Sequence, residues 1–234
     1  YVSGMPFRRK TSRRPKKRPV TRTRKSRIPR SVTTYNTNVG ISTTKNVTLT
    51  YYDNIGFTPT SGIAKSHTFT MSGIYDPDIT GTGHQPYGHD QWALMYKHYI
   101  VKSAKITVRF SNIATNNIPH KVSIILDKDN VIDASRNTRM ERTKGKSTAT
   151  LLANSNNVQT VSAVYNVKKF FDFRNSNDSH QVKALMTANP TLPAYALVVV
   201  QPYDQVSTSA TAIYGEVTIN YNVTLMDPIP FAGS

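Results

Sequence analysis

Apolar and polar residues alternate along Ile213-Tyr214-Gly215-Glu216-Val217-Thr218-Ile219-Asn220-Tyr221-Asn222-Val223-Thr224-Leu225. Successive side chains of an extended strand point to opposite faces, so the apolar residues of this stretch share one face and the polar residues the other. A long strand with one apolar face is typical of an antiparallel sheet that is packed on one side only. The stretch therefore predicts a half-buried strand over residues 212–225.

Seven further segments have strand character. Alternation with threonine is clear at 47–51 and at 67–71, and the other candidates are 99–110, 121–126, 147–153, 158–168 and 194–201. No apolar period of 3.6 residues persists long enough to predict a major helix, although one or two helical turns are expected within 90–99 and within 131–139. The chain is therefore expected to be all-β.

Long connections rich in Gly, Asn and Pro separate the second strand from the third, the fourth from the fifth and the sixth from the seventh. Eight strands with long alternate loops predict an eight-stranded antiparallel jelly-roll sandwich made of two sheets. Loops of this length commonly form functional surfaces.

The charge is concentrated at one end of the sequence. The first thirty residues contain thirteen Lys and Arg and no acid, the first acid being Asp53, and without them the net charge of +17 falls to +4. A segment with so few large apolar groups and so much self-repulsion does not offset the entropy of ordering. We therefore predict a disordered, basic arm over residues 1–34 and one folded domain over residues 35–234. The thirteen cations are Arg8, Arg9, Lys10, Arg13, Arg14, Lys16, Lys17, Arg18, Arg22, Arg24, Lys25, Arg27 and Arg30.

This basic arm predicts binding to nucleic acid, because each cation that pairs with a phosphate releases a condensed counterion. The alternative, a charge run that serves only solubility, needs far fewer cations than thirteen. No aromatic residue lies between Phe7 and Tyr35, so base stacking is nearly absent and binding is expected to be independent of sequence. Residues 13–18 also resemble a nuclear localisation signal, which a host import receptor would bind.

Several other function classes are not favoured by the sequence. The absence of cysteine excludes disulfides, thiol nucleophiles and cysteine zinc sites. The longest apolar run, 194–200, is far shorter than the roughly 20 residues of a membrane helix, so no membrane partner is expected. The sequence contains no catalytic fingerprint, and an enzyme is not expected.

Two groups of residues resemble metal ligands, but neither has the spacing of a metal site. His84, His89 and His98 lack the i, i+4 pairing of a helical zinc site. The acids at 127, 129 and 133 resemble the start of a calcium loop, but Val131 and Ile132 stand where a ligand and the turn glycine belong. No metal or cofactor is expected, and weak calcium binding at a subunit interface stays open as an alternative.

A family resemblance is carried by Gly83-His84-Gln85-Pro86-Tyr87-Gly88-His89-Asp90-Gln91-Trp92 and, after it, by Tyr96-Lys97-His98-Tyr99-Ile100-Val101-Lys102-Ser103-Ala104-Lys105-Ile106. These stretches resemble the capsid proteins of circular, Rep-encoding single-stranded DNA viruses, in which a Pro/Gly-rich loop with aromatics leads into a strand of a single jelly roll. Residues 221–228 are similar to the closing strand and exit of that family. The resemblance implies a single jelly-roll capsid domain over residues 35–234.

In function, the resemblance implies a virion protein that assembles with copies of itself. Sixty copies would form a T=1 icosahedral shell, with the arms inside around a single-stranded DNA genome. Assembly in the host nucleus would follow from the import signal.

Two alternatives to this function stay open. One is a capsid protein of a small RNA or satellite virus, because phosphate binding does not read the 2′-hydroxyl and the arm does not separate DNA from RNA. The other is a non-capsid nucleic-acid-binding protein, such as a viral movement or nuclear shuttle protein.

Two loops are candidate surfaces. The first, over residues 74–99, supplies large rigid aromatics, which are enriched in protein interfaces, so we expect subunit contacts there. An equally weighted alternative is that these aromatics fill the base of the sandwich. These aromatics are Tyr75, Tyr87, Trp92, Tyr96 and Tyr99. The second loop lies between the fourth and fifth predicted strands, and it would line the particle interior, bind a host polyanion or simply be solvated. It carries Arg136, Arg139, Arg142, Lys144 and Lys146, with Glu141 as its one acid.

Overall fold

A computed structural model describes most of the chain after the predicted arm. The described residues are 41–81, 83–112, 118–133, 135–141, 145–153, 156–173, 180–209 and 212–230. They lie within one unit, Asn38–Ser234. The thirteen cations of the predicted arm lie outside the described residues. The boundary at residue 34 therefore stays a prediction.

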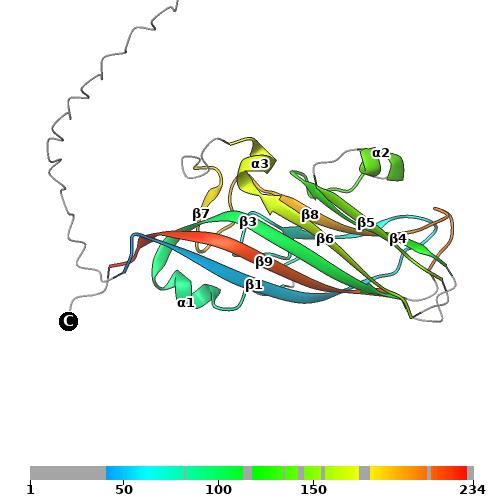
Figure 1. Ribbon diagram of the computed structural model, residues 1–234, viewed down its shortest axis with the longest axis horizontal. Helices are drawn as coiled ribbons and strands as arrows, with labels where there is room; N and C mark the ends of the chain where they lie inside the picture. Colours follow the sequence, from blue (N-terminus) through cyan, green and yellow to red (C-terminus); the bar gives the residue numbers. More distant parts are fainter. Residues whose placement is uncertain are drawn as a thin grey trace, which may run out of the picture. The chain divides into compact units, whose positions relative to one another are not determined.

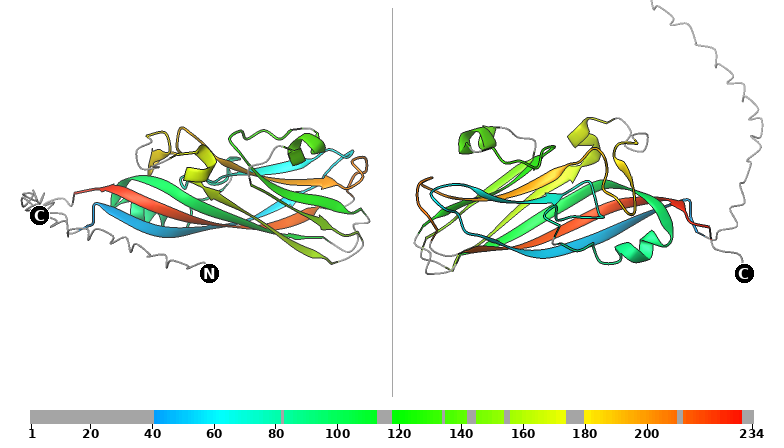
Figure 2. Two further views of the ribbon diagram at one scale, coloured as in Figure 1. Left: turned by 45° about the horizontal axis from the view of Figure 1, so that its top comes forward. Right: turned by 180° about the vertical axis from the view of Figure 1, so that it is seen from behind.

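Two antiparallel sheets form the sandwich (Figures 1 and 2). The first sheet has the order β1-β9-β3-β6, and the short strand β7 pairs with the start of β3. Its strands are β1 (Thr44–Phe57), β9 (Ile213–Pro228), β3 (Tyr96–Ser111), β6 (Val158–Asn166) and β7 (Lys183–Leu185). The second sheet has the order β2-β8-β4-β5. Its strands are β2 (Lys65–Thr70), β8 (Tyr195–Pro202), β4 (His120–Asp127) and β5 (Lys146–Leu151).

The connectivity is that of a jelly roll. Apart from β4 and β5, which are neighbours in one sheet, and the short β7, successive strands pass from one sheet to the other. Four strands in each of two facing sheets, linked in this way, make the double Greek key of a jelly roll. The predicted fold class is confirmed, and all eight predicted strands are present. Strand β7 has no counterpart among them, because three residues are too few for a recognisable alternation.

Three short helices lie between the strands of the described chain. Helix α1 (His89–Ala93) and helix α2 (Arg136–Glu141) agree with the two predicted helical segments. Helix α3 (Val167–Phe171) corrects the predicted strand 158–168, which ends at Asn166. The Asn166 side chain accepts hydrogen bonds from the amides of Lys168 and Lys169, at 3.1 and 3.3 Å, and thereby caps the helix. Within the described part of the chain, no helix is long and apolar enough to cross a membrane.

The inward faces of the two sheets form one apolar core. Tyr221 of β9 is fully buried in it, together with Ile219 of the same strand and Val198 of β8. The Tyr221 hydroxyl donates a 2.7 Å hydrogen bond to the backbone carbonyl of Thr70, so it links the first sheet to the end of β2 in the second. Burial raises the pKa of Tyr221 well above its usual value, which keeps the phenol protonated as a donor.

This link between the sheets gives a first testable prediction. Tyr221→Phe keeps the ring but leaves the Thr70 carbonyl without this donor, so we expect it to lower the free energy of unfolding by about 1–3 kcal/mol. Tyr214→Phe is the matched control: Tyr214 lies on the same strand but is 53% exposed, and removal of its hydroxyl should cost no more than about 0.5 kcal/mol. Urea unfolding of unassembled protein measures both. Equal stabilities would show that the hydrogen bond adds nothing.

Candidate functional site

The aromatic loop between β2 and β3 contains side chains with two different roles. Tyr96 and Tyr99, at the start of β3, are 2% and 0% exposed. The Tyr99 hydroxyl donates to the Ala188 carbonyl at 3.0 Å and accepts from the Ile74 amide at 3.2 Å, and burial raises its pKa. The Tyr96 hydroxyl donates to the carbonyl of Ser42. These two tyrosines belong to the core and present no surface to a partner. The expectation of subunit contacts is therefore corrected for them, in favour of the alternative that the aromatics fill the base of the sandwich.

The other three aromatics of this loop remain interface candidates. Tyr87 is 94% exposed and Tyr75 39% exposed, while Trp92 of α1 is partly buried and packs against the core with its ring 6.2 Å from that of Tyr96. Leu94, just after α1, is 78% exposed, and no pattern in the sequence marks it as a surface residue. The loop therefore combines buried rings that fix it with exposed apolar groups that are available to a partner.

The basic loop between β4 and β5 turns two of its arginines inward. Arg139 is 4% exposed and donates hydrogen bonds to the Asp133 carbonyl and to the Gln201 side chain. Arg136 donates from Nη1 to the Tyr203 carbonyl at 2.8 Å, from Nε to Gln201 at 3.2 Å and from Nη2 to a third acceptor, the carbonyl of Pro202. Burial lowers the pKa of both guanidinium groups. Both arginines thus hold α2 against the end of β8.

Gln201 is the centre of this arrangement. Its side-chain amide donates to the Gly62 carbonyl at 2.8 Å while its oxygen accepts from the two arginines, so it joins three segments of the chain. Lys146 donates to the Met140 carbonyl. Arg142 and Lys144 lie outside the described residues. The sequence suggests that this loop lines the particle interior, binds a polyanion or is merely solvated, and each of these interpretations assumes cations exposed to solvent. Arg136 and Arg139 instead have a structural role, because their side chains bond to backbone carbonyls and to Gln201.

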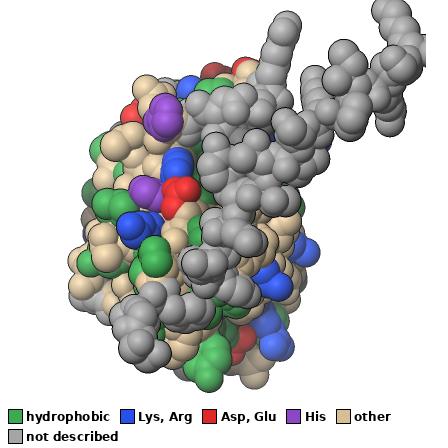
Figure 3. Space-filling model, turned by 90° about the vertical axis from the view of Figure 1, so that its left-hand side faces the viewer, with side chains coloured by type: hydrophobic (Ala, Val, Ile, Leu, Met, Phe, Trp, Pro, Cys, Tyr) green, Lys and Arg blue, Asp and Glu red, His purple; other side chains and the backbone are tan. Residues whose placement is uncertain are grey.

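The histidines are dispersed. His84 stacks on the ring of Tyr51 at 4.7 Å, and His89 is buried at the start of α1. His98 lies 2.7 Å from the Asp227 carboxylate, to which Lys183 also donates at 2.7 Å. The Lys183 hydrogen bond is the main cause that lowers the pKa of Asp227. Histidine, basic and acidic side chains lie side by side on the face of the molecule that Figure 3 shows.

The acids at the end of β4 form a turn. The Asp127 carboxylate accepts from the amide of Lys128 at 2.7 Å and from that of Asp129 at 3.5 Å. Among the described residues, no group of three or more His, Asp or Glu side chains is arranged to hold a metal ion. Asp127 therefore acts as a local backbone acceptor here.

One exposed sheet surface is a candidate site that the sequence alone does not indicate. The side chains that point away from the core on β1, β9 and the part of β3 after Val101 are mostly hydroxyls and amides, and we call this surface the outer polar face. It consists of Asn46, Thr48, Thr50, Tyr52, Asn54, Lys102, Ser103, Lys105, Thr107, Arg109, Tyr214, Glu216, Thr218, Asn220, Asn222 and Thr224.

Side-chain hydrogen bonds cross the strands of this face. Asn222 accepts from Thr48 at 3.1 Å and donates to Ser103 at 3.0 Å, which connects β1, β9 and β3 in one row. In neighbouring rows, Thr50 donates to Asn220 at 2.9 Å and Thr224 donates to Asn46 at 2.7 Å. These bonds hold the amide groups in fixed orientations.

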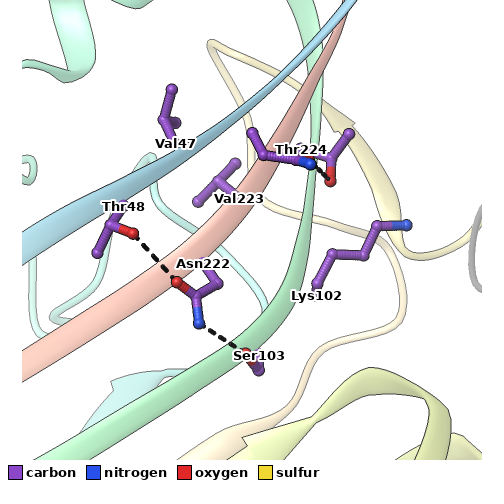
Figure 4. Close-up of a pocket in the computed structure, with 8 residues that line it drawn as sticks. Val47, Thr48, Lys102, Ser103, Asn222, Val223 and Thr224 are labelled. Atoms are coloured by element: carbon purple, nitrogen blue, oxygen red, sulfur yellow. Dashed lines mark hydrogen bonds between the residues drawn. The ribbon is translucent and has the colours of Figure 1, made fainter.

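An open pocket of about 510 Å³ lies at one end of the outer polar face (Figure 4). A β-bulge between Val101 and Ser103 makes Lys102 the extra residue of β3, and Lys102 lines the pocket beside Asn222 and Thr224. Burial, and to a smaller degree the positive charge of Lys168, lower the pKa of Lys102. The described residues that line the pocket are hydroxyl and amide side chains, two valines and one lysine, without an acid.

Comparison with known proteins finds similarity in structure only. No family model matches the chain, and no curated protein is similar to it in sequence. The Cocksfoot mottle virus structure is 15% identical with a TM-score of 0.49, over 80% of this chain and 97% of that chain. A Mud crab tombus-like virus structure is 12% identical with a TM-score of 0.45, over 85% and 96%. The BFDV capsid protein, in a decameric form, is 12% identical with a TM-score of 0.39, over 78% and 99%. Similarities of this size assign no function to the chain.

The division within the aromatic loop gives a second prediction. Trp92→Ala removes a ring that packs on the core, so it should lower the free energy of unfolding by about 2 kcal/mol. Tyr87→Ala removes an exposed ring, so it should leave stability within about 0.5 kcal/mol of the parent but reduce self-association. Urea unfolding and sedimentation velocity measure the two effects. A Tyr87→Ala protein that self-associates like the parent would remove Tyr87 from the interface.

Proposed function

We propose that the protein is a viral capsid subunit that assembles with copies of itself and packages single-stranded DNA through its basic arm. The observation that carries this proposal is the joining, in one chain, of a jelly-roll sandwich to a segment with thirteen cations and no acid. A jelly roll is the architecture of viral capsid domains, though also of lectins and cupins, which do not require such a segment. The role is structural, not enzymatic.

The folded domain supplies the shell in this proposal. Its exposed apolar side chains near α1, Tyr87 and Leu94, are suited to contacts with neighbouring copies. The resemblance at residues 83–106 supports a small T=1 icosahedral shell of sixty copies. The protein would then be found in the virion, and in the host nucleus during assembly if an import receptor binds residues 13–18.

The cargo in this proposal is single-stranded DNA. The same resemblance supports single-stranded DNA, whereas phosphate binding by the arm suits RNA equally well. A nuclease test on nucleic acid recovered from particles separates the two. Sensitivity to DNase with resistance to RNase supports a DNA genome, and the reverse supports RNA.

Assembly is the decisive test against a non-capsid nucleic-acid-binding protein. Sedimentation velocity of the full chain with single-stranded DNA should show one large, homogeneous species. A monomer or dimer at every protein and salt concentration would overturn the capsid proposal and favour a movement or shuttle protein.

A further prediction concerns the arm. If it acts by neutralising phosphates, the affinity for single-stranded DNA should fall with salt at a log-log slope of about −0.7 per phosphate contacted, or roughly −9 if all thirteen cations engage. Replacing the five cations Arg13, Arg14, Lys16, Lys17 and Arg18 with Gln should weaken binding to every sequence about equally. It should also make the slope shallower by about 0.7 for each phosphate that is no longer neutralised.

The matched control keeps the charge. Replacing only Arg13, Arg14 and Arg18 with Lys should reduce the affinity modestly and leave the slope unchanged. Fluorescence anisotropy with two unrelated DNA sequences, at several salt concentrations, measures both variants. A sequence-selective weakening of binding in the Gln variant, or an unchanged slope, would contradict an electrostatic arm.

A further inference from the structure

The outer polar face carries more positive than negative charge. Between Tyr214 and Thr224 on β9, and opposite these residues on β1 and β3, the outward-pointing charged groups are Lys102, Lys105, Arg109 and Glu216. The one acid among these described residues, Glu216, lies 4.0 Å from Arg109. Lys168 adds a further positive charge beside Lys102, whose pKa it lowers in addition to the larger effect of burial. This face therefore favours an anionic ligand.

Two exposed aromatic rings lie on the same face. Tyr52 of β1 is 49% exposed and Tyr214 of β9 is 53% exposed. Tyr214 pairs with Gly56, and its ring packs 3.7 Å from the position that a Cβ of Gly56 would take. Because Tyr52 and Gly56 are four residues apart on one strand, the backbone positions of Tyr52 and of Tyr214 opposite Gly56 are separated by about 13 Å along the sheet. Exposed aromatic rings among cations are the elements that bind single-stranded nucleic acids.

We propose that the outer polar face binds single-stranded DNA, with Tyr52 and Tyr214 stacking on bases and Lys102, Lys105 and Arg109 contacting phosphates. This inference rests on the proposed function, because it takes the packaged DNA as the ligand. It adds to the basic arm a second binding surface, located on the folded domain.

The composition of the face favours DNA over a second copy of the chain. The central part of a protein interface is rich in apolar residues and poor in charged ones, whereas this face consists mainly of hydroxyl, amide and basic groups. Its amides are held by cross-strand hydrogen bonds such as Asn222 with Ser103, and so are oriented before a ligand arrives. The pocket beside Lys102, at about 510 Å³, is within the size range of small-ligand sites.

The position of the face in the sequence adds a second argument. Asn46, which lines the pocket, follows the predicted end of the arm by only twelve residues. A DNA strand held by the arm is thereby kept at a high effective concentration near the start of β1, so weak contacts on the sheet suffice for binding.

Photo-cross-linking of the full chain to an oligo(dT) of about twenty nucleotides, long enough to span the arm and one such surface, tests the proposal directly. We expect ultraviolet cross-links to peptides that contain Tyr52 or Tyr214, identified by mass spectrometry. Cross-links confined to the residues of the arm would overturn the proposal.

Variants test the energetic contribution. The double variant Tyr52→Ala/Tyr214→Ala should bind the oligo(dT) at least about fivefold more weakly than the parent, while its affinity for heparin, a polyanion without bases, should be unchanged. Tyr203→Ala is the matched control, since Tyr203 is 55% exposed but lies directly after β8 in the other sheet. An unchanged affinity of the double variant for oligo(dT) would overturn the stacking role.

Sedimentation of the same variant separates this inference from the proposed function. Particles that form normally but retain less DNA support the outer polar face as a DNA-binding surface. Absence of particles with unchanged affinity for oligo(dT) would assign the face to subunit contact and overturn the inference. A parent protein that forms no particles would overturn the proposed function, whereas the cross-links would still decide whether the face binds DNA.

Discussion

The sandwich is organised around β9, which pairs with a strand on each of its sides. β9 is in register with β1 from Thr44 to Phe57 and with β3 along nearly its whole length, so its position fixes both neighbours. Side chains alternate with a period of two, and a slip by one residue would expose Tyr221 and bury Asn222. The hydrogen bond from Tyr221 to Thr70 opposes such a slip, because its acceptor belongs to the second sheet.

The same register also builds the outer polar face. Each residue of β9 that enters the core places its neighbours on the outside, so the rows that join Asn222 to Thr48 and Asn220 to Thr50 follow from the packing of the core. The orientation of these amides needs no separate loop or helix to maintain it. A sheet surface of this kind is as rigid as the sandwich that carries it, in contrast to a surface formed by long loops.

The strands could be predicted from the sequence because their alternation is local. The end of the strand at Asn166 could not, since the residues that follow continue the alternation and only the cap formed by the Asn166 side chain starts a helix there. The burial of individual side chains at the candidate sites is likewise not predictable from the local sequence. The sequence around Tyr96 and Tyr99 suits interface aromatics and core aromatics equally, and that around Arg139 indicates a solvated cation, whereas all three side chains lie inside the folded domain. Whether a polar or aromatic side chain is buried depends on contacts with segments distant in sequence.

The outer polar face depends most strongly on such non-local information. Tyr52 and Tyr214 are separated by most of the folded domain in the sequence, and only the pairing of β1 with β9 places them on one surface. Each alone is an ordinary exposed tyrosine. Together with Lys105 and Arg109 they offer what the arm lacks, since the arm has many charges but no aromatic ring between Phe7 and Tyr35. Counterion release gives affinity that salt weakens steeply, whereas stacking on a rigid ring depends little on salt. A chain that joins the two would therefore capture DNA by charge and order part of it by stacking.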